Sequence, residues 1–177
     1  LEINNGYIVL GSLHEYELDA PSDIWLTHFD LDLSDNGDTL WSSIWDIDAY
    51  DYPTSMVENL EGGYTIAGYS SSSNSGDNGS SWVIKSDIAG AGNILTSFSG
   101  NNFIYSMIED ENGNYILAGK KTENSDTQGW IISISPSGVQ NWERLYGDAD
   151  IDAFYSIEQT SDKGFILSGE TYNNGLG

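Results

Sequence analysis

The segment Gly63-Tyr64-Thr65-Ile66-Ala67-Gly68 decides the fold, because the chain contains three more segments of the same pattern. Each begins with glycine or asparagine, continues with an aromatic residue and three mostly aliphatic or small residues, and ends in glycine. The other copies are residues 6–11, 114–119 and 164–169, so the spacing is about fifty residues. Self-similarity at such a period is the signature of a repeat architecture.

Three further elements recur in the same order and phase. The first is a strand-like run that opens at Trp25, Trp82 and Trp130. The second is a turn glycine, followed four residues later by Trp41, Thr96 or Trp142; these glycines are Gly37, Gly92 and Gly138. The third is another strand-like run, which starts at Ser55, Ser106 and Ser156. The runs are rich in Ile, Val, Tyr, Trp and Thr and are separated by clusters of Gly, Asn, Asp and Ser, which is typical of β-strands joined by turns. No stretch sustains an apolar period of 3.6 residues, so no helix is predicted.

These patterns predict an all-β fold: a β-propeller-like array of four-stranded antiparallel blades, with three full repeats and a partial one. Since one such sheet cannot bury both faces, neighbouring blades must stack, and the repeated Trp and Tyr side chains should fill the space between them. We expect residues 1–177 to form a single repeat domain, with repeat phases that begin near residues 7, 64, 115 and 165. The chain opens on the tail of a strand at residues 1–3 and supplies thirteen more strands. A propeller of about four blades needs more, so we expect a piece of a longer propeller.

Composition excludes several classes of function. The chain carries 28 acidic and five basic residues, a formal charge of −23, and no cysteine. A surface that binds nucleic acid needs clustered Lys and Arg, so nucleic acid is not an expected partner. Without cysteine there is neither a disulfide framework nor a thiolate metal site. Because the longest apolar run is only as long as a strand, no membrane insertion is expected.

The repeat also resembles a known family. Its pattern is Gly-Tyr-Ile-x-x-Gly, Asp-x-Trp-x-x-x-x-Asp, Gly-x-x-x-Trp and Asp-x-x-x-Ser, written first at residues 6–11, 23–30, 37–41 and 51–55. This is similar to the propeller-type repeats of large secreted bacterial and archaeal surface proteins, such as those of Bacteroidetes that carry a type IX sorting tail. Later copies depart from it at Thr96, in place of tryptophan, and at Asn102, in place of aspartate. The resemblance implies export and an extracellular or cell-surface location, and it implies no catalytic residue.

One polar position recurs just before the expected first strand of each blade. Asp51, Asn102 and Asp152 occupy it. If this strand is the innermost one, the three side chains should line one mouth of a central channel and hold a cation or a sugar hydroxyl. The alternative is that each side chain caps the preceding turn by bonding backbone N–H groups.

A second candidate site is an acidic turn that suggests calcium. Asp32, Ser34 and Asn36, followed by Gly37, match the opening of a calcium loop, in which alternate residues supply oxygen and glycine makes the sharp turn. The twelfth position is Ser43 instead of a glutamate, so an acidic turn without metal is the alternative. No cofactor is required by the sequence, and calcium is the one its residues suggest. The proposed ligands are Asp30, Asp32, Ser34 and Asn36.

Catalytic signatures are missing from the sequence. The two histidines, His14 and His28, lack the spacing of a metal pair or a triad, and His28 is expected to face solvent from a strand. We therefore expect a non-catalytic extracellular module for binding, adhesion or scaffolding. Its partner would be a protein or carbohydrate at the cell surface, or further repeats of the same chain. The alternatives are a fragment of a sialidase- or glycoside-hydrolase-type propeller enzyme, and a self-assembling surface or filament subunit whose open strand edges pair.

Overall fold

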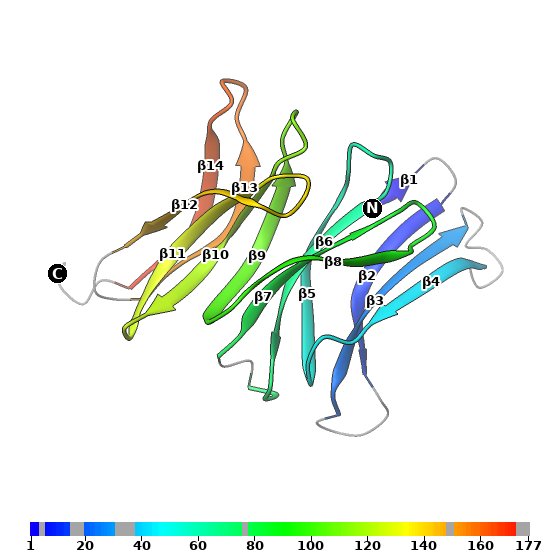
Figure 1. The fold of residues 1–177 in the computed structure, drawn as a ribbon, viewed down its shortest axis with the longest axis horizontal. Coiled ribbons are helices and arrows are strands. Elements are labelled where there is room, and N and C mark those ends of the chain that lie inside the picture. Colours follow the sequence, from blue (N-terminus) through cyan, green and yellow to red (C-terminus); the bar gives the residue numbers. More distant parts are fainter. Residues whose placement is uncertain (4–5, 15–19, 31–37, 76–77, 148–150, 173–177) are drawn as a thin grey trace.

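The computed structural model describes residues 1–3, 6–14, 20–30, 38–75, 78–147 and 151–172. These residues form β-strands and connecting turns, without a helix, in four consecutive antiparallel units that lie side by side in chain order (Figure 1). Unit 1 contains β1 (Glu2–Ile3), β2 (Gly6–His14), β3 (Ser22–Asp30) and β4 (Thr39–Trp45). Unit 2 contains β5 (Tyr50–Glu58), β6 (Tyr64–Ser71), β7 (Ser80–Ser86) and β8 (Gly92–Phe98). Unit 3 contains β9 (Asn101–Glu109), β10 (Tyr115–Glu123), β11 (Asp126–Ile134) and β12 (Gln140–Tyr146), and unit 4 contains β13 (Asp152–Gln159) and β14 (Phe165–Thr171).

The all-β class and the antiparallel pairing are confirmed. Within each unit, strands that follow one another in sequence pair in antiparallel register. Units 1 and 2 are joined into one eight-stranded sheet by a single parallel pair, Ser22 with Tyr50, and a parallel bridge from Thr127 to Ile151 relates units 3 and 4 in the same way. The described residues close neither a barrel nor a ring of sheets.

The first strand of each unit begins earlier than predicted. The predicted starts were Ser55, Ser106 and Ser156, whereas β5, β9 and β13 begin at residues 50, 101 and 152. The reason is a β-bulge just before each serine. One extra residue shifts the pairing register there, and the strand goes on pairing with its neighbour on the N-terminal side of the bulge. The prediction that residues 51, 102 and 152 precede the strand is therefore wrong, because all three lie within it.

The bulge explains why each repeat ends its signature in glycine. A Cβ atom on Gly119 would lie 1.8 Å from the carbonyl oxygen of Phe103 on the bulged strand, and one on Gly169 would lie 2.0 Å from the carbonyl oxygen of Ala153. Real Cβ atoms do not approach backbone so closely, so only glycine fits opposite the bulge. Gly11 faces no such strand, and its nearest neighbour would be a ring atom of Trp25 at 3.7 Å.

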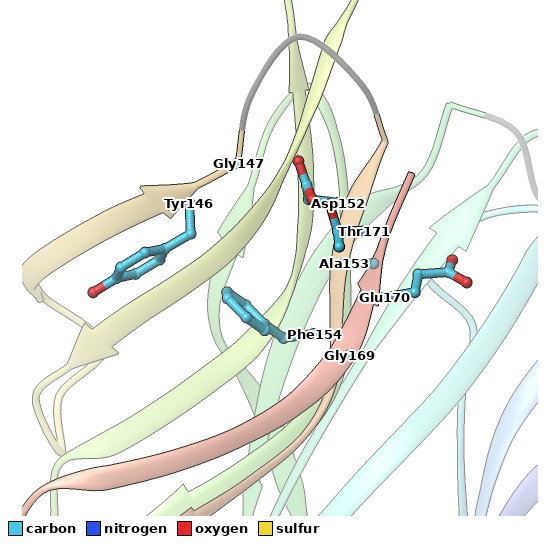
Figure 2. Close-up of a pocket in the computed structure, with 8 residues that line it drawn as sticks. All are labelled: Tyr146, Gly147, Asp152, Ala153, Phe154, Gly169, Glu170 and Thr171. Carbon is cyan, nitrogen blue, oxygen red and sulfur yellow. The ribbon is translucent and has the colours of Figure 1, made fainter. Parts of the chain in front are cut away.

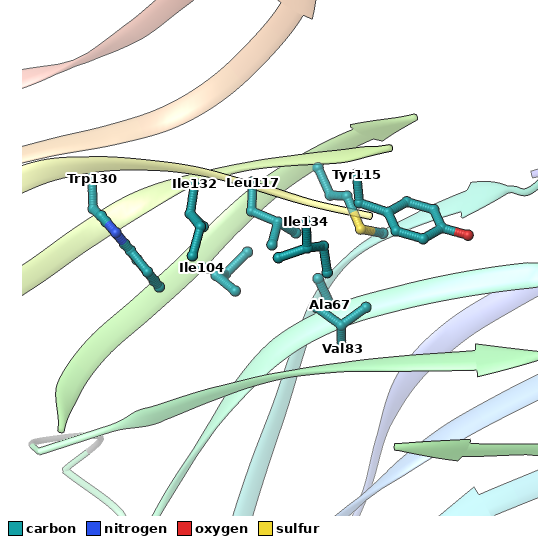
Figure 3. Close-up of a cluster of buried hydrophobic side chains, with 9 residues drawn as sticks. Ala67, Val83, Ile104, Tyr115, Leu117, Trp130, Ile132 and Ile134 are labelled. Carbon is teal, nitrogen blue, oxygen red and sulfur yellow. The ribbon is translucent and has the colours of Figure 1, made fainter. Parts of the chain in front are cut away.

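Apolar clusters between the units form the core. The cluster between units 2 and 3 joins Ala67 and Val83 to seven residues of unit 3 (Figure 3), namely Ile104, Met107, Tyr115, Leu117, Trp130, Ile132 and Ile134. A second cluster lies between units 1 and 2, and a third joins Ile157 of unit 4 to unit 3. The repeated aromatic residues Tyr64, Tyr115, Trp82 and Trp130 are among the largest fully buried side chains. Their predicted role in packing between units is confirmed.

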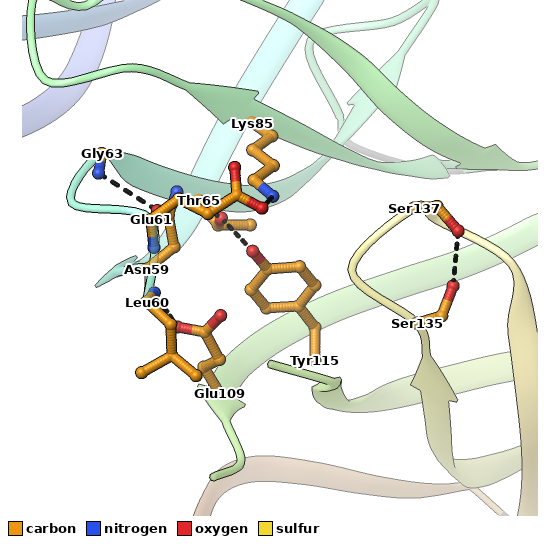
Figure 4. Close-up of polar contacts among 10 residues, drawn as sticks. All are labelled: Asn59, Leu60, Glu61, Gly63, Thr65, Lys85, Glu109, Tyr115, Ser135 and Ser137. Atoms are coloured by element: carbon orange, nitrogen blue, oxygen red, sulfur yellow. Dashed lines mark hydrogen bonds and ion pairs between the residues drawn. The ribbon is translucent and has the colours of Figure 1, made fainter. Parts of the chain in front are cut away.

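Hydrogen bonds also connect units 2 and 3 (Figure 4). The Thr65 hydroxyl donates to the Tyr115 hydroxyl at 2.9 Å, and both residues are buried. The Leu60 N–H donates to the Glu109 carboxylate at 3.0 Å. Each of these bonds joins residues about fifty positions apart, so the contact between units has a defined register.

The serine of the repeat pattern makes a further bond of this kind. The Ser55 hydroxyl accepts a hydrogen bond from the Met107 N–H of unit 3 at 3.1 Å, and the Ser106 hydroxyl accepts one from the Ile157 N–H of unit 4 at 3.3 Å. β9 and β13 are edge strands of their sheets, so N–H groups on the outer side of each strand have no ladder partner, and these serines supply an acceptor. The serine thus links unit 2 to unit 3 and unit 3 to unit 4.

Candidate functional site

Asp51 is a buried turn cap. One carboxylate oxygen accepts the Ile47 N–H at 2.9 Å, and the other accepts the Ser70 hydroxyl. Burial raises the pKa of Asp51, the hydrogen bonds from Ser70 and Ile47 oppose that rise, and the negative charge of Asp46 adds to it. The pKa of Asp51 is thus higher in the folded protein than in the unfolded chain. Ionisation of this carboxyl group therefore lowers the free energy of unfolding as the pH rises through the folded pKa.

Asn102 caps the equivalent turn with different chemistry. Its side-chain oxygen accepts the Ser81 N–H at 2.8 Å. Its amide nitrogen donates to the carbonyl oxygens of Phe98, Ser99 and Gly100 at 3.1–3.2 Å. An aspartate cannot donate these bonds, so the local carbonyl groups account for the departure from the repeat pattern. At both positions the structure matches the capping alternative.

Asp152, the third member of the predicted set, lies at a cavity. The cavity measures about 280 Å³ and is lined by the ends of β12 and β14 and the start of β13 (Figure 2). Asp152 is buried, and one of its carboxylate oxygens has no hydrogen-bond partner among the described residues. Tyr146 and Phe154 supply aromatic walls, with ring centroids 5.8 Å apart. Asp152 therefore borders an open cavity.

Asp51 is also one of three aspartates whose carboxylates lie close enough together to contact a single metal ion. Carboxylate oxygens of Asp23, Asp46 and Asp51 lie within 4.8 Å of one another. Both Asp51 oxygens already accept hydrogen bonds from the protein, so turn capping accounts for this carboxylate without an ion.

The predicted calcium turn lies largely outside the described residues. Residues 32, 34 and 36 are among those not described, and Asp30 ends β3 with its N–H bonded to the Asp38 carbonyl at 3.0 Å. In unit 2 the equivalent Asp87 carboxylate accepts the Ala89 and Ala91 N–H groups. In unit 3 the equivalent Ser135 hydroxyl accepts the Val139 N–H. In these two turns the residue at this position is a backbone cap, and calcium at the first turn stays a prediction.

An aromatic row at the starts of β5, β9 and β13 and near the end of β6 was not anticipated from the sequence. We call it the aromatic row; its members are Tyr52, Tyr69, Phe103, Tyr105 and Tyr155. Ring centroids of successive members are 4.9 to 6.4 Å apart, and the row runs from unit 2 to unit 4. Tyr105 and Tyr155 are the extra residues of their bulges, and bulges commonly redirect a side chain. The Tyr155 hydroxyl donates to the Glu170 carboxylate, and this bond together with burial raises the pKa of Tyr155 to about 12.

A polar cavity adjoins this row, and we call it the Phe103 pocket. It measures about 380 Å³ and is lined by Asn78, Asn101, Phe103, Lys120, Thr122 and Thr127. The Lys120 ammonium lies 4.7 Å from the centroid of the Phe103 ring and forms no ion pair with any described residue. The side-chain oxygen of Asn101 is buried and has no partner within the described ranges. Phe103 is 6% exposed, so the pocket offers mainly a cation and amide and hydroxyl groups to one ligand, with a small apolar part from the Phe103 ring.

The histidines do not form a catalytic site. His28 is buried against Trp41, with ring centroids 5.7 Å apart, so the prediction that it faces solvent is wrong. The cause is the cluster between units 1 and 2, which extends over this strand position. His14 is exposed at the far end of β2.

The described part of the chain contains no helix of the length and apolarity needed to cross a lipid bilayer. Comparison with known proteins finds no protein-family model and no curated protein that matches the sequence.

Proposed function

We propose that the chain is part of a non-catalytic, β-propeller-like module of an extracellular or cell-surface protein, and that it binds carbohydrate in the Phe103 pocket. The observation that carries the proposal is the chemistry of this pocket. A sugar presents an apolar face and a rim of hydroxyl groups. The ammonium, amide and hydroxyl groups of the pocket are complementary to those hydroxyl groups, and the small exposed part of Phe103 adds an apolar contact.

Lys120 narrows the expected ligand class. The chain has a formal charge of −23, and three of its five basic side chains, Lys85, Lys121 and Lys163, form ion pairs. Lys120 instead lies in the pocket, half-buried and without an ion pair to a described residue. A sugar that carries a carboxylate would gain a charge-assisted hydrogen bond there. We therefore expect uronic or sialic acids to bind better than neutral sugars.

The propeller arrangement and the location rest on separate support. Four-stranded antiparallel units that stack through apolar faces are the building blocks of propellers. The resemblance of the repeat to secreted surface proteins favours export, and the acidic composition suits a protein that stays soluble in salt-containing surroundings.

A glycan array tests the binding proposal. Wild-type protein is expected to bind a set of acidic glycans, and Lys120→Ala and Asn101→Ala are each expected to weaken that binding roughly tenfold, because each removes a hydrogen-bonding group from the pocket. Lys163→Ala is the matched control, since Lys163 is an exposed lysine that pairs with Glu111 away from the pocket. Equal binding by all four proteins, or binding to no glycan, would refute the assignment.

A hydrolysis screen with the same glycans addresses the enzyme alternative. Besides Asp51, Glu109 is a described carboxyl group whose pKa is raised, chiefly by burial. Its bond from the Leu60 N–H gives it a structural role between units 2 and 3. We expect no turnover of any glycan; turnover that is lost in Glu109→Gln would replace the binding function by a hydrolase.

A further inference from the structure

A tryptophan from the last strand of one unit packs against the next unit at two of the three contacts between described units. In unit 1 the Trp41 ring lies 6.1 Å from the Tyr64 ring of unit 2, measured between centroids. In unit 3 the Trp142 ring lies 6.4 Å from the Phe165 ring of unit 4. Tyr64 and Phe165 share one repeat position, and both tryptophans pack against core clusters. An indole ring therefore fills the same place in both contacts.

The contact between units 2 and 3 lacks this ring. Trp41 and Trp142 each lie opposite the same repeat position of the neighbouring strand, at residues 28 and 133. In unit 2 that position is Lys85, and Asn93 lies opposite it. Strand pairing thus places Asn93 where two other units have tryptophan, whereas the spacing along the sequence indicated Thr96.

A cavity of about 440 Å³ lies beside Asn93, and Lys85 and Leu95 also line it. Leu95 takes over only part of the contact that the tryptophan makes elsewhere. A Cβ atom on Gly138 of unit 3 would lie 3.0 Å from Cγ of Leu95, and one on the equivalent Gly90 of unit 2 would lie 2.5 Å from the Trp41 ring. Because leucine is smaller than tryptophan, part of the space stays open as the cavity.

We infer that this cavity binds a planar, electron-rich aromatic group of about the size of indole. The same place accepts an indole ring at the other two contacts, and a cavity left by a missing ring is a binding site for a molecule of that shape. The Asn93 amide offers a donor and an acceptor to a ring heteroatom.

Lys85 favours an aromatic ligand over an aliphatic one. In unit 1 its equivalent, His28, packs against the Trp41 ring with centroids 5.7 Å apart. An ammonium group at that position can contact the face of a bound ring through a cation–π interaction. The Lys85 ammonium also donates to the Glu61 carboxylate at 2.7 Å, which holds it at this end of the strands (Figure 4).

The site is distinct from the Phe103 pocket. It lies where β7 ends and β8 begins, whereas the Phe103 pocket lies at the opposite end of the units, where β9 begins. Unit 2 has a stacked unit on each side, so the cavity belongs to a complete contact between two units.

Titration with two probes tests the inference, followed by the NMR signals of the Asn93 side-chain amide. Indole is expected to bind with a dissociation constant on the order of 1 mM. N-acetyltryptophanamide presents the same ring as a protein side chain would. Binding of both probes would assign the site to an aromatic side chain as well as to a free ligand, and binding of indole alone would assign it to a small molecule.

Two variants separate the cavity from its cation. Asn93→Trp supplies the missing ring, so it is expected to abolish indole binding and to raise the melting temperature by about 3 °C. Lys85→Ala keeps the cavity and removes the cation, so indole should bind about fivefold more weakly. Lys163→Ala is the matched control, because Lys163 pairs with Glu111 away from the cavity and should leave indole binding unchanged.

Three results would each overturn the inference: no binding to the wild type at about 10 mM indole, unchanged binding in Asn93→Trp, or equal binding in Lys85→Ala and the wild type. Lys85→Ala introduces no larger side chain, so it remains informative if Asn93→Trp does not fold. Glycan binding at the Phe103 pocket is a separate property and should persist in both variants.

Discussion

Replacing Gly119 by alanine is expected to destabilise the protein by about 3 kcal/mol, because the new Cβ atom would lie 1.8 Å from the Phe103 carbonyl oxygen. That oxygen belongs to the backbone of a neighbouring strand, so it cannot move aside as a flexible side chain would. Either the β9–β10 pairing shifts or the bulge is lost. Urea denaturation monitored by tryptophan fluorescence measures the change.

Gly11→Ala is the matched control at the same repeat position. Gly11 pairs with Trp25 of β3, but no described bulged strand lies on its other side, and the nearest atom to the new Cβ would be at 3.7 Å, an ordinary contact. Alanine also loses less conformational freedom on folding, so a gain of about 0.5 kcal/mol is expected. A similar loss of stability in both variants would show that the glycine serves something other than the bulge.

Trp130→Ala is expected to cost about 4 kcal/mol, the second large effect. Trp130 is 2% exposed within the cluster between units 2 and 3, and its indole N–H donates to Glu143 at 3.1 Å. Removing the ring leaves a cavity and breaks the bond to Glu143, whose carboxylate keeps Lys121 as a partner at 3.6 Å. The free energy of unfolding in dilute solution measures the loss.

Trp25→Ala tests whether this cost comes from stacking between units. Trp25 occupies the equivalent strand position but is only half-buried and belongs to none of the apolar clusters between the described units. Truncation at Trp25 removes less buried apolar surface than at Trp130 and creates no enclosed cavity. The free energy of unfolding is therefore expected to fall by about 1 kcal/mol. Equal costs at the two tryptophans would mean that the rings act within their own sheets and that the units do not depend on one another.

The strands were predictable because the repeat presents the same pattern four times. The segment from Tyr64 to Gly68 reads as a strand in every copy, and its turns carry the expected Gly, Asn and Asp residues. The bulge was not predictable, because an extra residue in a strand changes neither composition nor period. Its trace in the sequence is the glycine itself, whose steric reason becomes visible only once β9 pairs with β10 and brings the Phe103 carbonyl group against Gly119.

The site was predictable only in part, for a similar reason. Repeat comparison identified Asp51, Asn102 and Asp152 as one position, but their hydrogen-bond partners decide that the first two cap turns and the third borders a cavity. The Phe103 pocket was missed because its residues come together through pairing register. Thr122 lies opposite Asn101 and Thr127, and Lys120 lies opposite Phe103. No spacing along the chain encodes that arrangement.

The central claim is that each unit buries its apolar face against the next. A methyl-resolved nuclear Overhauser spectrum in dilute solution measures this most directly, since the two sides of the interface are far apart in sequence. The structure predicts cross-peaks from the methyl groups of Ala67 and Val83 in unit 2 to those of Ile104 and Ile134 in unit 3. Cross-peaks that stay within single units, with none between units 2 and 3, would contradict the stacked arrangement.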